Sequence, residues 1–429
     1  MRYLPFVLLF VFLPAGSNAA TIHVPEDQPS IQAGIGAAGA GDTVLVACGT
    51  YLEHDIAMKS GVVLRSETGE AGCVTIDAQA MGRVIFCNQV DALAAIEGFQ
   101  LTGGSAAGHD PGSQGGAVAL LNSSPRIRAC AIVENDGPSC GGGIYAYRSS
   151  SLIENCVFAR NTAIDGAGIY LNLASPRILG CTFHDNDCMV WGGAVYCQGP
   201  CSPELSHCTL ARNDAYQGGG LWCVVDCHIR VENSLICFST DGEGIYAYDN
   251  PGHPCEVVVR CCDVYGNAGA NYGGTLPDQT GIEGNISADP LFCDMAGDDF
   301  RLDAISPCLP GHNQCNVLIG ALGVGCPAAT VPEVDGPEPF ALVHIGSPFQ
   351  VETTIDFATA QAAAVNLEVF DLAGRRVRTL AWERVYAAGR HGVRWDGRDE
   401  EGGALASGVY ICRFSCASVR QSRPVVLIR

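Results

Sequence analysis

Aromatic side chains recur once in each of five successive sequence repeats, at Tyr145, Tyr170, Tyr196, Trp222 and Tyr246. Each directly follows an apolar residue, and side chains alternate between the two faces of a strand, so inward apolar residues would place the rings outside. Stacked strands would repeat the rings about every 4.8 Å, close to the length of one sugar residue. The pattern predicts an exposed glycan-binding face, on which Trp222→Ala weakens binding and changes stability little. The alternative is a stripe that stabilises the sheet or lies beneath a loop.

Acidic residues recur near the same repeats, at Asp136, Asp165, Asp187, Asp214 and Asp241. Their offset within the repeat varies, so the spacing does not make them converge as calcium ligands must. Aspartate is common in solvated turns, and that is the role we expect for these residues. The sequence therefore predicts no cofactor, with calcium as the alternative.

His184 and Asp185 together resemble a catalytic base and the carboxylate that orients it. Adjacent residues on a strand point to opposite faces, so we expect that they do not form a dyad.

Cysteine is abundant, with 23 residues, and an odd number leaves at least one thiol without a partner in the chain. Cys197-x₃-Cys201 and Cys223-x₃-Cys227 occupy matching places in adjacent repeats. This spacing suits either a metal site or two local disulfides, and export to an oxidising compartment favours the disulfides.

Paired glycines and the apolar residue after them recur every 24–26 residues between residues 115 and 272, with the apolar positions at Val118, Ile144, Ile169, Val195, Leu221 and Ile245. Units of this length cannot bury an apolar face alone, but stacked units can. The sequence predicts an all-β parallel β-helix of roughly ten to twelve coils over residues 21–325.

Two further ladders follow from the same repeat. Cysteines recur at Cys130, Cys156, Cys181 and Cys208, and asparagines at Asn135, Asn161, Asn186 and Asn213. We expect the cysteines to pack inward as thiols, because a one-coil separation is slightly too long for a relaxed disulfide. We expect each asparagine amide to bond to the next, as stacked amides do.

Composition excludes several functional classes. The net charge is −21 with a single lysine, Lys59, which disfavours nucleic acid and anionic membranes as partners. A basic start, the apolar run Leu4–Leu13 and small residues at 17–19 predict a signal peptide over residues 1–20 and a secreted or outer-surface protein. No stretch is long enough to span a bilayer, and we expect a monomer.

The C-terminal part of the chain differs from the rest in composition and charge. Residues 326–339 form a Pro-rich linker, and residues 340–429 carry a net charge of +2, which leaves −23 on the rest. Alternating strands such as 365–370, each followed by turn residues, predict a small β-sandwich over residues 340–429. At the other end, Ile31–Ala38 is expected to form a short helix that caps the open coil stack.

The flanking segments carry a family resemblance. Two parts of the chain resemble right-handed β-helices of the pectin-lyase-like superfamily. The beginning of such a helix is matched by the run from Ser30 through Gly41-Asp42-Thr43-Val44 to Gly49-Thr50-Tyr51. The end is matched by Asp289-Pro290-Leu291-Phe292 and Ser306-Pro307-Cys308. The C-terminal region resembles the immunoglobulin-like domain of flagellar hook-capping proteins and secretion-sorting modules. The matching residues are Asp371-Leu372-Ala373-Gly374-Arg375, Trp395-Asp396-Gly397 and Ser407-Gly408-Val409-Tyr410. The second resemblance implies attachment or export and no chemistry of its own.

Two hypotheses about the function are consistent with these sequence features. The first is a noncatalytic bacterial surface or secreted protein that binds polysaccharide or another cell-surface component. The second is a polysaccharide lyase or glycoside hydrolase. The Asn-x-Asp, Asp-Asp, Gly-His-Gly and Arg-x-Lys signature of polygalacturonases is not present as a set, and a single lysine at Lys59 rules out its last motif. The sequence thus favours binding and assigns no catalytic residue or metal ligand.

Overall fold

The computed structural model describes residues 19–108, 113–248, 250–326, 341–345, 349, 351–371, 374–416 and 419–429. These residues form two compact units that divide between residues 328 and 329. The expected signal peptide up to residue 18 and residues 327–339 of the expected linker lie outside the described residues. Among the described helices, none is long and apolar enough to cross a membrane.

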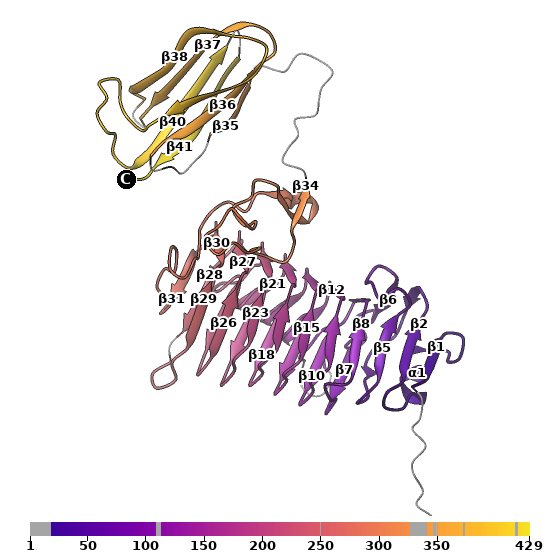
Figure 1. Cartoon of the computed structure of the whole chain (residues 1–429). Coiled ribbons are helices and arrows are strands. Elements are labelled where there is room, and N and C mark those ends of the chain that lie inside the picture. The colour runs from indigo at the N-terminus through magenta and orange to yellow at the C-terminus, as the bar shows by residue number, and fades with distance from the viewer. Residues whose placement is uncertain are drawn as a thin grey trace, which may run out of the picture. The chain divides into compact units, whose positions relative to one another are not determined.

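The first unit is a parallel β-helix, as the repeats predict (Figure 1). Three long sheets run along it, and successive strands of each sheet pair in parallel, one coil apart. Sheet A consists of β1 (Thr21–Val24), β2 (Thr43–Val46), β5 (Val63–Ser66), β8 (Ala95–Glu97), β11 (Arg126–Arg128), β15 (Leu152–Glu154), β19 (Arg177–Leu179), β23 (Glu204–Ser206), β26 (His228–Glu232) and β29 (Glu256–Arg260). Sheet B consists of β3 (Gly49–Tyr51), β6 (Val74–Asp77), β9 (Phe99–Thr102), β12 (Ala131–Val133), β16 (Val157–Ala159), β20 (Thr182–His184), β24 (Thr209–Ala211), β27 (Leu235–Cys237) and β30 (Asp263–Tyr265). Sheet C consists of β4 (Ile56–Ala57), β7 (Ile85–Asn88), β10 (Val118–Leu121), β14 (Ile144–Tyr147), β18 (Ile169–Asn172), β22 (Val195–Gln198), β25 (Leu221–Val224), β28 (Glu243–Tyr248) and β31 (Ala270–Gly274).

A short fourth sheet interrupts the regular coil in the middle of the repeats. Sheet D consists of β13 (Asp136–Cys140), β17 (Thr162–Asp165) and β21 (Asp187–Trp191). Each of its strands lies between the asparagine of the repeat and the paired glycines. At the turn that follows β13, Gly141 has a φ of +68°, and a Cβ there would lie 2.5 Å from the carbonyl oxygen of Ile144. Only glycine fits this turn, which explains the recurrence of glycine at this position.

The interior of the coils is lined by the two predicted ladders. The cysteines Cys130, Cys156, Cys181 and Cys208 are buried and not disulfide-bonded. Each thiol lies near two backbone carbonyls, as the Cys156 Sγ does at 3.3 Å from Glu154 O and 3.7 Å from Ile127 O. The expectation of a packed thiol ladder is confirmed, and Cys156 and Cys181 lie in neighbouring coils.

The asparagine ladder is also confirmed. The Asn135 amide donates to Asn161 Oδ1 at 3.0 Å, Asn161 to Asn186 at 3.0 Å, and Asn186 to Asn213 at 2.8 Å. All four side chains are buried. Burying an amide is favourable only when its donors and acceptors are satisfied, and stacking the same residue in each coil satisfies them.

We expect Asn161→Ala to lower the free energy of unfolding of the β-helix by about 2–3 kcal/mol, because it leaves the buried Asn135 N–H without its 3.1 Å acceptor and removes the amide ladder on both sides. Asn172→Ala, at the end of β18 where the residue is only half-buried, is the matched control and should cost much less. Urea unfolding of both variants checks this. Equal losses would show that the ladder adds nothing specific.

A helix closes the N-terminal end of the coil stack, and a later segment covers part of its side. Helix α1 (Ile31–Ala37), with Ser30 as its N-cap, buries Ile31 and Ile35 against the first coils, as predicted. After the last coil, β32 (Phe292–Asp294), η1 (Met295–Gly297), β33 (Asp299–Asp303) and β34 (Val324–Cys326) form a closing segment that lies against the outer side of sheet B. Its Phe300 and Leu302 pack with Leu235 and Cys237 of sheet B in a second small core.

The second unit consists of two antiparallel sheets, as predicted for a β-sandwich. One contains β35 (Ala341–Ile345), β36 (Thr353–Thr359) and β39 (Gly389–Trp395). The other contains β38 (Arg376–Tyr386), β37 (Ala363–Phe370), β40 (Gly408–Cys416) and β41 (Val419–Leu427). Trp395, Phe357 and Phe414 are buried together between them.

Candidate functional site

The five predicted aromatic residues form one column on sheet C. Tyr145 pairs in register with Tyr170, Tyr170 with Tyr196, Tyr196 with Trp222, and Trp222 with Tyr246. The first four rings are stacked, with centroid separations of 5.6, 4.6 and 4.7 Å. The prediction of one ring per coil is therefore correct.

The predicted exposure of this column is wrong. Tyr145, Tyr170, Tyr196 and Trp222 are only 3–6% exposed, and Tyr246 is half-buried. They pack with Cys140 of β13 and Trp191 of β21, whose ring lies 5.2 Å from that of Trp222. The residues read from the sequence as turns are the strands of sheet D, and these contribute side chains that cover the rings. The column is thus a small second core, and it cannot serve as an open platform in this conformation.

Burial also affects the polar atoms of this core. It raises the pKa of Tyr145 to about 12 and raises the pKa values of Tyr170 and Tyr196 further. Desolvation raises the pKa of Asp165 to about 6, and its buried Oδ1 has no hydrogen-bond partner. These shifts are consequences of a closed environment.

Four of the five recurring aspartates fall into two columns. Asp136, Thr162, Asp187 and Asp214 share one register position, whereas Asp165 pairs with Cys140 and Trp191. Among the described residues, two groups of three side chains bring potential ligand atoms within 4.8 Å of one another, and neither contains these aspartates. Calcium binding here stays an untested alternative.

One of those groups joins His184 and Asp185 to Asp298. The expectation that the first two do not meet is wrong, because His184 Nδ1 lies 2.8 Å from Asp185 Oδ2. Asp185 has a φ of +54°, so strand alternation ends at His184 and the carboxylate turns back. Arg212 donates to both Asp185 and Asp298, and its guanidinium lies over Phe300. A cation already bridges the carboxylates, so this cluster anchors the closing segment and is poorly suited to a metal ion.

The second group fits a metal no better. It comprises Cys48, Glu67 and Cys73, but Cys48 and Cys73 form a disulfide. Their sulfurs are therefore not thiolates and are not available as ligands.

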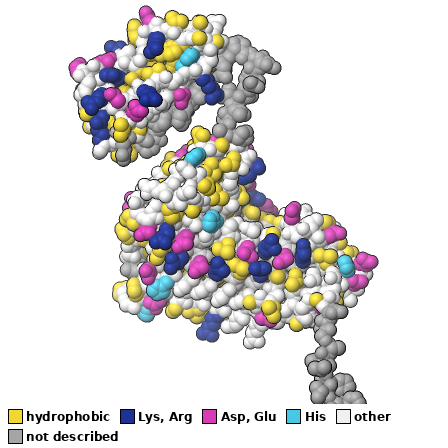
Figure 2. Space-filling view, in the orientation of Figure 1, with side chains coloured by type: hydrophobic (Ala, Val, Ile, Leu, Met, Phe, Trp, Pro, Cys, Tyr) yellow, Lys and Arg dark blue, Asp and Glu magenta, His cyan; other side chains and the backbone are white. Residues whose placement is uncertain are grey.

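The outer face of sheet A offers an open polar surface that the sequence analysis did not identify. Side chains of successive coils align on it in two rows. One row is Arg126, Leu152, Arg177, Glu204, Arg230 and Val258, and the other is Arg128, Glu154, Leu179, Ser206, Glu232 and Arg260. Figure 2 shows basic and acidic side chains alternating in a band across the strands of this face.

Ion pairs link neighbouring positions of the two rows. Arg177 Nε lies 3.2 Å from Glu204 Oε2, and Arg126 Nε lies 3.3 Å from Glu154 Oε2. Arg126, Arg177 and Glu204 are exposed and Glu154 is half-buried, so each pair contributes little to stability. The cost of rearranging them around a ligand is correspondingly small.

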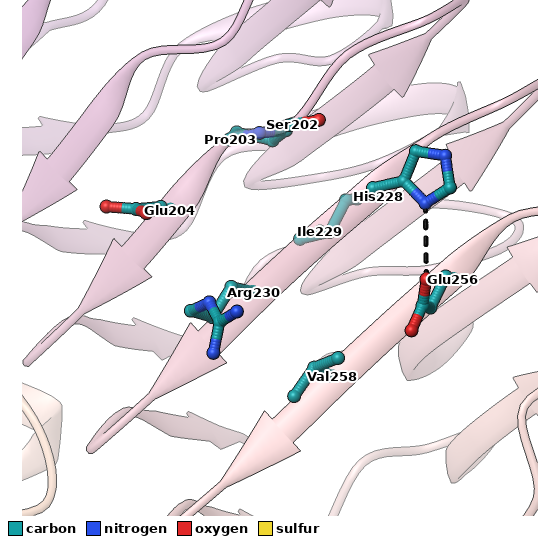
Figure 3. A pocket seen from close by; sticks show the side chains of 8 residues that line it. All are labelled: Ser202, Pro203, Glu204, His228, Ile229, Arg230, Glu256 and Val258. Carbon is teal, nitrogen blue, oxygen red and sulfur yellow. Dashed lines mark hydrogen bonds and ion pairs between the residues drawn. The ribbon is translucent and has the colours of Figure 1, made fainter.

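A shallow depression of about 270 Å³ lies on this face between β23, β26 and β29 (Figure 3). Glu204, His228, Arg230 and Glu256 surround it, and His228 Nδ1 lies 3.3 Å from Glu256 Oε2. Donors and acceptors of both signs thus face solvent at a one-coil spacing. A signal for this surface exists in the sequence, because charged residues recur at equivalent positions of the second strand after the paired glycines of each repeat.

Residues 96–286 match the family model described as the right handed beta helix region. Residues 346–417 match the FlgD Ig-like domain. The resemblances to a right-handed β-helix and to the immunoglobulin-like domain of flagellar hook-capping proteins are confirmed. No curated protein matches the chain.

One similar solved structure is the enzymatically active domain of tailspike protein 4 of bacteriophage CBA120. The identity is 9% and the TM-score 0.22, over 90% of this chain and 64% of that one. A similarity of this size does not bear on activity.

Proposed function

We propose that this chain is a secreted or surface-attached bacterial protein that binds polysaccharide on the outer face of sheet A, without cleaving it. The observation that carries the proposal is the pair of charged rows, in which hydrogen-bonding groups repeat at the spacing of the coils, about 4.8 Å. A linear chain of sugar residues has a similar repeat and presents hydroxyl groups to each coil.

The charge of this surface limits the class of polysaccharide that it can bind. Arginines and glutamates are paired along the rows, so the face as a whole is not strongly cationic. A chain with a net charge of −21 repels polyanions at low salt. We therefore favour a neutral or zwitterionic polysaccharide as the ligand.

The position of the acidic groups supports binding over catalysis. A general acid at neutral pH needs a carboxyl group with a raised pKa, which burial commonly provides. The carboxylates at the depression are open to water, with the Glu256 side chain 69% exposed and that of Glu204 49% exposed. The FlgD Ig-like domain supports a role in attachment or export for the second unit.

Arg230→Ala tests the binding surface. We expect about tenfold weaker affinity for a polysaccharide selected on a glycan array, equivalent to about 1.4 kcal/mol, because an exposed arginine at the centre of the depression supplies several donors. Stability should not change, because the side chain is 52% exposed.

Arg148→Ala is the matched control, because it removes an exposed arginine at the end of a sheet C strand. Equal affinity of the two variants, or no binding to any array glycan, would contradict the proposal. A product assay on the same glycans would favour the lyase or hydrolase alternative if it detected cleavage.

A further inference from the structure

Three cysteines align in successive coils at the turn between sheets C and A. Cys201 and Cys227 are paired in register, and the next coil places Cys255 beside Cys227, because the following residues His228 and Glu256 are register partners. The Sγ atoms of Cys201 and Cys227 are 3.1 Å apart. The sequence favoured disulfides within each Cys-x₃-Cys segment, but in the structure neither segment is bridged and this sulfur contact runs between coils.

The same fold already contains a disulfide between adjacent coils. Cys48 and Cys73 directly precede Gly49 and Val74, which are register partners, and their Cα atoms are 4.7 Å apart. A one-coil separation is therefore compatible with a disulfide, contrary to our expectation from the sequence. In the main thiol ladder the sulfurs lie against backbone carbonyls, and the Cys227 sulfur does so too, at 3.0 Å from Val224 O. In addition, the Cys201 and Cys227 sulfurs are in direct contact.

This column is also open to solvent at one end. Among the described cysteines outside disulfides, Cys255 is half-buried and all the others are buried. Hydrogen bonds from Cys223 and Cys227 lower the pKa of Cys255, which favours its thiolate form. Hydrogen bonding to Cys201 and Cys255 raises the pKa of Cys227, which therefore holds its proton.

We propose that Cys255, Cys227 and Cys201 form a thiol–disulfide exchange site that accepts a low-molecular-weight disulfide at Cys255. The Cys255 thiolate attacks one sulfur of the reagent, whose S–S bond breaks. The first thiol leaves with a proton from water, and a mixed disulfide remains on Cys255.

Cys227 then loses its proton and attacks the Cys255 sulfur, which expels the second thiol and leaves a Cys227–Cys255 disulfide. Attack by Cys201 on Cys227 moves the bond inward and regenerates the Cys255 thiolate. The reagent disulfide is reduced to two thiols while two protein thiols are oxidised, so atoms and electrons balance.

The test uses the full chain, with oxidised glutathione as the disulfide, acid quenching and peptide mass spectrometry. Wild-type protein should form Cys201–Cys227 or Cys227–Cys255 bonds and release two glutathione molecules per chain. Cys255→Ser should slow the reaction at least tenfold. Cys227→Ser should stop at one glutathione retained on Cys255.

Cys156→Ser, in the buried ladder, is the control and should react as the wild type does. Cys255 is half-buried, so its serine variant keeps the test valid even if Cys227→Ser fails to fold. Disulfides that form without these three cysteines would overturn the proposal. So would a metal ion that native mass spectrometry finds bound to the purified chain and whose removal by a chelator is required for any exchange.

Discussion

Replacing Trp222 by alanine is expected to lower the free energy of unfolding of the β-helix by about 3–5 kcal/mol. The indole is 4% exposed and stacks against Tyr196, at 4.7 Å, and against Trp191, at 5.2 Å. Its removal leaves a cavity beneath sheet D that the stacked rings on either side cannot fill. This is the reverse of the outcome expected for an exposed sugar platform. Urea unfolding of the full chain measures the loss.

Two variants separate packing from other effects of this substitution. Tyr248→Ala removes a neighbouring ring that is 48% exposed, and it should cost under about 1 kcal/mol. Trp222→Phe retains an aromatic ring and removes the indole N–H, which is buried without a partner, so it should cost less than the alanine variant. Unchanged stability in Trp222→Ala together with lost glycan affinity would restore the platform interpretation.

The regular part of this fold could be predicted because identical positions in successive coils face identical surroundings. The Asn161 amide donates to Asn186, which occupies the same position in the next coil and presents its acceptor in the same geometry. The recurrence of asparagine in the sequence therefore indicates a contact between neighbouring coils. Register, the asparagine ladder, the thiol ladder and the column of rings all follow from this one relation.

Sheet D could not be predicted by the same reasoning. Strand alternation places Tyr170 on the outer side of its sheet, which is correct, but alternation does not reveal whether another layer covers that side. The strands that cover it contain turn-forming residues, such as Gly137 and Pro138 in β13, and so resemble loops. The exposed rows of sheet A were missed for a related reason. Leu152, Leu179 and Ser206 interrupt the charged residues of the two rows, which therefore resemble ordinary solvated residues.

Contacts outside the repeat carry no sequence signal of this kind. The disulfides Cys261–Cys315 and Cys293–Cys326 hold the closing segment, where no period indicates which cysteines meet. The contact between His184 and Asp185 depends on a single left-handed residue at the end of a strand. Such local departures from regular geometry are visible only in the three-dimensional structure.

The β-helix should also lose stability as the pH rises from about 4 to 7, because of Asp263. Its side chain is fully buried beneath the closing segment, where Ala288 N donates to Oδ1 at 3.0 Å and Cys308 Sγ lies 3.2 Å from Oδ2. Desolvation, with a smaller contribution from Asp289, raises the pKa of Asp263 to about 7 in the folded protein, from 3.8.

The direction of the effect follows from proton binding. Between these two pKa values the folded chain holds a proton that the unfolded chain has released, so raising the pH favours unfolding. The stabilising contribution is complete below pH 4 and is lost as the pH passes 7. A shift of this size corresponds to about 4 kcal/mol.

Urea midpoints of the β-helix transition between pH 4 and 8 measure this dependence, and comparison with Asp263→Asn isolates it from other groups. Asparagine is neutral throughout this pH range and preserves the shape of the side chain. The variant should therefore not show the loss of stability that ionisation of Asp263 causes in the wild type. When each protein is compared with its own stability at pH 4, the variant should be the more stable of the two at pH 8. Asp136→Asn removes an exposed carboxylate of the same kind and should retain the wild-type slope. Parallel pH profiles for wild type and Asp263→Asn would mean that Asp263 ionises in the folded chain as freely as in the unfolded one. In that case the closing segment does not exclude water from this carboxyl group.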